Sequence, residues 1–79
     1  SVTFQHEFQI GETSKEFWIE EQPRAGWVVD RMTCKSRGVD VDPSRIVRTD
    51  PATPGDPVRF TVDLRPDEAL SCFVWSDRA

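Results

Sequence analysis

Two cysteines constrain the fold of this chain more than any other feature of its sequence. Cys34 ends the segment Trp-Val-Val-Asp-Arg-Met-Thr-Cys, and Cys72 lies in a second apolar segment, Leu-Ser-Cys-Phe-Val-Trp. A chain of 79 residues buries only about 60–65% of the surface that its unfolded form exposes, so its stability is marginal without a cross-link. We expect a Cys34–Cys72 disulfide between facing strands, which implies an oxidising compartment. Two buried free thiols in a reducing compartment are the alternative.

Apolar side chains alternate with polar ones along most of the chain, which is the period of a half-buried β-strand. Turn residues recur about every ten positions, and no helical period of apolar residues persists beyond one turn. This pattern predicts an all-β fold, a small antiparallel sandwich of six or seven strands. We expect a single module over 1–79, taken from a longer protein. The expected strands are 2–10, 15–21, 27–34, 39–42, 46–49, 58–64 and 70–75, with an irregular proline-rich loop at 50–57.

The strand that carries Cys34 contains a conflict of side-chain direction. Trp27 and Val29 share one parity, whereas Met32 and Cys34 share the other, and a regular strand cannot point all four toward the core. A β-bulge near residues 30–31 resolves the conflict, and we predict one there. Trp27 is then expected to be a core residue that packs near the disulfide.

Three large aromatic residues have the parity opposite to the core positions of their own strands. Trp18 is flanked by Glu16 and Glu20, and Phe73 and Trp75 flank an apolar position of the last strand. Large aromatics outside a core usually mark a contact surface. We therefore expect these three residues to mark a candidate interaction surface, with the two glutamates as its polar rim. Whether the three form one patch depends on which strands are neighbours, which the sequence leaves open. Burial in a second core layer is the alternative.

Charge and motif content exclude several classes of function. The chain has 10 basic and 14 acidic residues, a net charge of −4, and no basic stripe of the kind that binds nucleic acid. No apolar run is long enough to span a membrane. Asp40, Asp42 and Ser44 have the spacing of a calcium loop, but Arg45 replaces the required glycine, which favours a turn capped by aspartates. We expect a monomer without a metal or cofactor.

Catalysis is not expected either. The single histidine, His6, falls on the apolar face of the first strand, where it is expected at a strand end or hydrogen-bonded under a loop. A non-enzymatic structural or adhesive module is the first hypothesis, and a carbohydrate- or protein-binding module that uses its exposed aromatics is the second. Inhibition of a protease by the proline-rich loop 50–57 is a third hypothesis.

One stretch of the chain resembles a known family. A glutamate (Glu20 or Glu21) is followed by Pro-Arg-Ala-Gly-Trp-Val-Val at 23–29 and Met-Thr-Cys at 32–34. An aliphatic strand, a turn and the cysteine-containing strand 70–74 complete the pattern. It is similar to prealbumin-like (transthyretin-like) β-sandwich repeats of secreted bacterial surface proteins, relatives of the collagen-adhesin B-type stalk repeats, over residues 17–76. The resemblance implies an extracellular or cell-surface module that meets neighbouring domains, or a surface protein or glycan.

The chain departs from that family in its last turn and its last strand. The turn carries Asp67 and Glu68 where these repeats have glycine, and Ser76 occupies the place of their asparagine. Lys15 and Lys35 are the only lysines, so the intramolecular isopeptide bond of many stalk repeats is not expected here. The disulfide would take over that cross-linking role.

Overall fold

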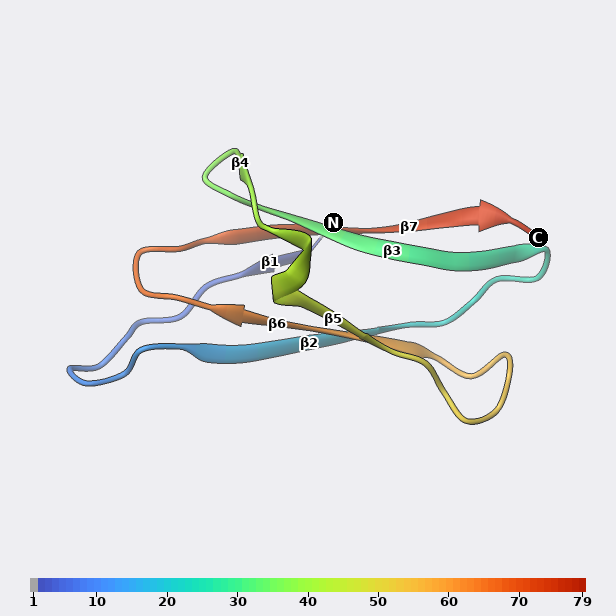
Figure 1. Ribbon diagram of the computed structural model, residues 1–79, viewed down its shortest axis with the longest axis horizontal. Coiled ribbons are helices and arrows are strands. Elements are labelled where there is room, and N and C mark those ends of the chain that lie inside the picture. Colours follow the sequence, from blue (N-terminus) through green and yellow to red (C-terminus); the bar gives the residue numbers. More distant parts are fainter. Residues whose placement is uncertain (1) are drawn as a thin grey trace.

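The computed structural model describes residues 2–79, which form two antiparallel β-sheets packed face to face. One sheet has four strands in the order β1-β7-β3-β4, and the other has three in the order β2-β6-β5. Figure 1 shows the two sheets as an upper and a lower layer. The predicted all-β antiparallel sandwich is thereby confirmed. Its elements are β1 (Val2–Phe4), β2 (Lys15–Glu21), β3 (Trp27–Ser36), β4 (Val39–Asp40), the 3₁₀-helix η1 (Pro43–Arg45), β5 (Ile46–Thr49), β6 (Val58–Leu64) and β7 (Leu70–Arg78).

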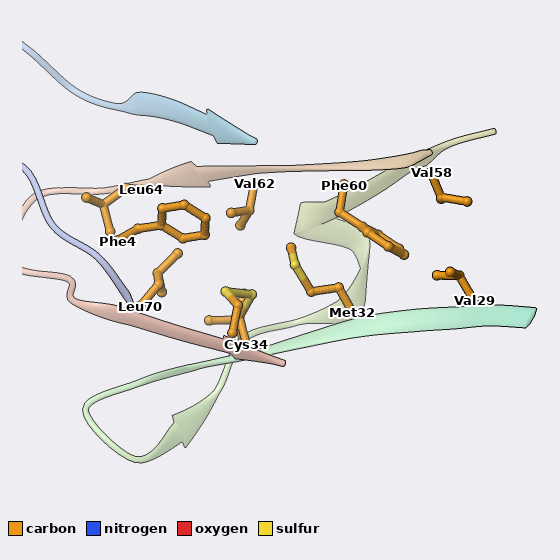
Figure 2. Close-up of a cluster of buried hydrophobic side chains, with 11 residues drawn as sticks. Phe4, Val29, Met32, Cys34, Val58, Phe60, Val62, Leu64 and Leu70 are labelled. Carbon is orange, nitrogen blue, oxygen red and sulfur yellow. A yellow bond between two sulfur atoms is a disulfide. The ribbon is translucent and has the colours of Figure 1, made fainter. Parts of the chain in front are cut away.

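The core lies between the two sheets and follows from the alternation in the strands. Every second residue of β6 is buried, while Arg59 and Asp63 between them are exposed. Figure 2 shows the buried β6 side chains facing those of β3 and β7 across the core. These buried residues form one cluster, so the described chain has a single core: Phe4, Val29, Met32, Cys34, Val41, Val58, Phe60, Val62, Leu64, Leu70 and Cys72.

The predicted disulfide is present and joins β3 to β7. Cys34 lies directly opposite Cys72 in the register of the two strands, so the bond links neighbours within one sheet. The carbonyl oxygen of Cys34 accepts a hydrogen bond from the Val41 amide on the opposite side of β3. The cysteines are therefore a non-hydrogen-bonded pair, the position at which side chains on adjacent strands come closest.

The predicted β-bulge is also confirmed. Val29 lies opposite Ser76 and Arg31 lies opposite Trp75, so Asp30 is the extra residue in β3. The bulge reverses the parity of β3, and both Val29 and Met32 point into the core.

The first strand is shorter than the sequence pattern predicts. It ends at Phe4, whose partner in the neighbouring strand is Leu70, the first residue of β7. Beyond that point β7 offers no backbone to pair with, so the chain leaves the sheet despite its alternating pattern. Ile10 is fully exposed, and Phe8 is only half-buried against the core. The expectation of a strand over 2–10 was therefore wrong from Gln5 onward.

Trp27 is not the core residue that the sequence predicts. Its side chain is 39% exposed, and the Arg78 guanidinium lies 5.3 Å from its ring centroid. Figure 2 shows Val29 and Val58 at the end of the core. Trp27 lies two residues beyond Val29, a distance of about 6.6 Å along a strand, whereas the opposing strand begins only at Val58. The tryptophan therefore stands at the open end of the sandwich and away from the disulfide.

Helix is nearly absent from the described part of the chain. Its only helical segment is the three-residue η1, so no helix there could cross a membrane. Asp42 caps η1 by accepting a hydrogen bond from the Ser44 amide at 2.9 Å. The aspartate-capped turn expected at this position is confirmed.

Candidate interaction surface

Two of the predicted aromatic residues lie together on the outer face of the four-stranded sheet. Phe73 and Trp75 are successive outward residues of β7, and each is 48% exposed. The Trp75 indole Nε1 donates a hydrogen bond to Thr33 Oγ1 at 2.8 Å, and the Arg31 guanidinium lies 5.4 Å from the ring centroid. The indole is therefore held in one orientation with its polar nitrogen satisfied. We call Phe73, Trp75, Thr33 and Arg31 the β7 aromatic face.

The third aromatic lies on the other sheet. Trp18 is an outward residue of β2 and is 50% exposed. The Arg59 guanidinium of the neighbouring strand lies 4.0 Å from the ring centroid, and its Nη2 is 3.9 Å from Glu20 Oε1. One side of the Trp18 ring is therefore occupied by a cation. Glu16 lies directly opposite Asp63, a like-charged pair with no cation bound to either side chain among the described residues.

The residues of the candidate interaction surface therefore lie on two different faces. Trp18, Glu16 and Glu20 belong to the outer face of the three-stranded sheet, and Phe73 and Trp75 belong to the outer face of the four-stranded sheet. Figure 1 shows β2 and β7 in opposite layers. The predicted exposure of all three aromatics is confirmed, but they do not form one patch. Strand parity can predict exposure, whereas assignment of each strand to a sheet requires the long-range pairing.

A groove of about 600 Å³ opens along one side of the sandwich, between β3 and β5. Its lining includes the core residues Met32 and Phe60 together with Ile46, and it also includes charged residues. The groove exists because β4 pairs with only two residues of β3, Lys35 and Ser36, which leaves the rest of that edge uncovered. Such a groove has the size and apolar lining to hold a small apolar group.

Arg48 lines this groove, and no sequence motif indicated a role for it. Its Nη1 donates hydrogen bonds to the carbonyl oxygens of Val29 and Asp30, and its Nε donates to Asp50 Oδ1 at 2.8 Å. These carbonyls belong to the β-bulge, which disrupts the regular pairing of the strand. Arg48 thus ties the two sheets together at the irregular point of β3. Arg48 lies opposite the buried Phe60, so the alternation of side chains along β5 could have identified it as an inward residue.

A second arginine fixes η1 to the turn between β6 and β7. Arg45 Nη1 and Nη2 lie 2.9 Å and 2.6 Å from the two carboxylate oxygens of Glu68, and Nη2 also donates to the Asp63 carbonyl. Glu68 Oε1 accepts a further bond from the Arg65 amide. The hydrogen bonds from Arg45 hold the pKa of Glu68 below its ordinary value of 4.5, because they favour the charged carboxylate. The same bonds raise the pKa of Arg45.

His6 lies in the loop that follows β1. Its Nε2 is 3.3 Å from Glu12 Oε2, and its ring meets Phe8 edge-on with 4.7 Å between the centroids. Glu12 also accepts a bond from the Gln9 amide, so the carboxylate organises this loop. His6 was expected on the first strand, at its end or hydrogen-bonded under a loop. The hydrogen bond is present, but the residue lies in the loop itself.

No family model, curated protein or solved structure matches the chain.

Proposed function

We propose that this domain is a non-enzymatic structural or adhesive module of an extracellular or cell-surface protein, which contacts a neighbouring domain or partner protein through the β7 aromatic face. The observation that carries this proposal is the position of the Cys34–Cys72 disulfide directly beneath that face. Phe73 is the residue after Cys72 on β7, and Thr33 precedes Cys34 on β3. The cross-link therefore stiffens the two strands that present the aromatics.

The chemistry of the face suits contact with protein. Half-exposed aromatic rings beside an arginine are the residue types that concentrate binding energy in interfaces. Because the Thr33 hydroxyl fixes the Trp75 ring, little side-chain entropy is lost when a partner covers it. The residue pattern that resembles prealbumin-like surface repeats, and the oxidised cysteines, support an extracellular setting.

The redox state of the cysteines in the native organism tests the extracellular part of the proposal. Intact cells are treated with an alkylating reagent that labels free thiols only, and the isolated protein is then analysed by mass spectrometry. We expect no label on Cys34 or Cys72 until a reductant is added after denaturation. Quantitative labelling of both cysteines without reductant would place the domain in a reducing compartment and contradict the proposal.

Contact through the aromatic face is tested on the secreted parent protein. Trp75→Ser and Phe73→Ser are compared with Trp18→Ser, a matched loss of a half-exposed aromatic on the opposite sheet. We expect the two β7 variants to increase hydrogen exchange in whatever domain or subunit covers this face, and the Trp18 variant to leave it unchanged. Equal behaviour of all three variants would show that the β7 face is not the contact.

Binding of carbohydrate is the second candidate, and the geometry of Trp75 favours it. A flat ring held by a hydrogen bond on its polar edge is suited to stack on a sugar ring. Titration of the domain with neutral oligosaccharides, followed by tryptophan fluorescence, distinguishes the two candidates. A saturable change that Trp75→Phe weakens would favour the sugar-binding module, whereas a purely structural module gives no saturable change.

A further inference from the structure

Part of one edge of β3 is covered by no other strand of the described chain. β4 pairs with β3 only at Lys35 and Ser36, after which the chain turns away into η1. Figure 1 shows β3 running on well past β4 and η1. These internal segments set the length of the gap, and β1 lies at the opposite edge of the same sheet. The groove between β3 and β5 follows this uncovered edge.

Met32 directs its backbone N–H and C=O into the gap. The Cys34 carbonyl accepts a hydrogen bond from the Val41 amide, on the side of β3 that faces away from β7. Backbone direction alternates along a strand, so Met32, two residues earlier, also directs both of its groups away from β7. Neither group has a hydrogen-bond partner among the described residues.

The two groups are unpaired although Met32 is only 4% exposed. Buried backbone N–H and C=O groups are nearly always paired in native proteins, because an unpaired group has lost its water without a replacement. Met32 belongs to the lining of the groove, so a molecule in the groove can reach it. One residue of an extended peptide supplies what is missing, since it offers one donor and one acceptor at the spacing of a β-ladder.

We propose that the groove binds an extended peptide segment of a partner protein, which adds to the open edge of β3 in line with β4. An antiparallel segment places one residue directly opposite Met32, and the two residues exchange both backbone hydrogen bonds. The side chain of that peptide residue points to the same face as the Met32 side chain, into the groove that Ile46 and Phe60 line. An aliphatic side chain suits this position.

The length of the gap and the charge beside it define the rest of the ligand. β4 bounds the gap at one end, and Arg48 occupies the Asp30 carbonyl at the other. Residues 31–33 are left, a length of about 10 Å. The peptide residue after the aliphatic one lies opposite Arg31, whose side chain is 60% exposed. Because opposite charges on adjacent strands attract, the recognised sequence is an aliphatic residue followed by Asp or Glu.

The site is small, so binding of an isolated peptide is weak. Three paired residues bury far less area than a standard interface, which corresponds to a dissociation constant on the order of 0.1–1 mM. Strand addition goes beyond the function proposed above and fails separately from it. Neither the exposure of Phe73 nor the redox state of the cysteines in the cell enters its geometry.

An NMR titration of the chain with a synthetic peptide tests the proposal. The probe is acetyl-Ser-Thr-Leu-Glu-Thr-Ser-amide. The matched control carries N-methyl-leucine, which lacks the N–H that the Met32 carbonyl would accept. We expect saturable shifts at the Met32 amide with the probe, and binding about tenfold weaker with the control. Absence of saturation up to about 5 mM probe, or equal binding of the two peptides, overturns the proposal.

Two variants of β5 test whether the peptide side chain enters the groove. Ile46 lines the groove, whereas its neighbour Val47 is 56% exposed and lies outside the lining. We expect Ile46→Ala to weaken probe binding by about threefold or more, and Val47→Ala to leave it unchanged. Equal effects of the two substitutions would contradict binding in the groove.

Hydrogen exchange on the wild type decides the matter if Ile46→Ala does not fold. Saturating probe should slow the exchange of the Met32 amide. The Thr33 amide, which already faces β7, should change little. Protection that appears at another surface, with the Met32 amide unchanged, would refute strand addition at this edge.

Discussion

Reduction of the Cys34–Cys72 disulfide should remove a large share of the stability of this domain. The two cysteines are 38 residues apart, and chain entropy then gives about 13 cal/mol/K, or about 4 kcal/mol at about 25 °C. A folded domain of 79 residues has a total stability of about 4–12 kcal/mol. The loop that the bond closes contains β5 and β6, which supply two of the three strands of the opposite sheet.

The measurement is urea unfolding of the oxidised and the reduced protein, followed by tryptophan fluorescence. We expect reduction to lower the free energy of unfolding by about 4 kcal/mol and the melting temperature by about 15–30 °C. The dependence on urea should also become steeper, because a chain without the cross-link expands further when it unfolds. The Cys34→Ala/Cys72→Ala variant controls for direct effects of the reductant and should not respond to it.

A small effect of reduction would refute this reasoning. If reduction lowers the free energy of unfolding by less than about 1 kcal/mol, the unfolded chain must already be restricted without the covalent bond, for example by residual pairing of β3 with β7. An unchanged urea dependence together with a large loss would instead assign the effect to packing of the two buried sulfur atoms in the native state.

Three further predictions concern single side chains and are checked by the same urea unfolding. Glu68→Gln should cost about 1–3 kcal/mol at neutral pH, since it weakens the charged hydrogen bonds with the largely buried Arg45. The stability that Glu68 contributes is fully present above its ordinary pKa of 4.5 and is lost as the pH falls through its lower folded pKa. The Glu68→Gln variant should therefore lose less stability in acid than wild type does. Equal acid sensitivity of the two proteins would contradict this. Trp27→Ala should cost only about 1–2 kcal/mol, and Phe60→Ala should cost about 3–5 kcal/mol because Phe60 is fully buried. The reverse order of the two losses would mean that Trp27 is a core residue after all. Arg48→Met should cost about 1–2 kcal/mol through the bulge carbonyls that lose their donor, and no loss would show that water replaces it fully.

Strand positions and side-chain directions were predictable where a local pattern decides them. The strand 58–64 alternates without interruption, and the structure places its ends at the same residues. The bulge in β3 was predictable because Val29 and Met32 cannot both point inward in a regular strand. The disulfide was predictable because each cysteine lies in an apolar segment and the chain is too small for its core alone to make it stable.

Features that depend on the partner strand were not predictable. Alternation in residues 2–10 is a strand pattern, yet the chain leaves the sheet at Phe4 because its partner begins at Leu70. Trp27 follows the inward parity of Val29, but the opposing sheet ends before reaching it. In both cases local parity was correct, and the extent of the neighbouring strand decided the outcome.

The apolar side of each strand is readable from the residues alone, because a period of two residues is a local property of an extended backbone. The grouping of strands into sheets is not, and it became visible only in the folded chain. The assignment of strands to sheets separates Trp18 from Phe73 and Trp75 and brings Arg48 to the bulge carbonyls. The physical reason is that pairing between distant strands depends on closure of long loops and on which edges meet, and no short stretch of sequence encodes either.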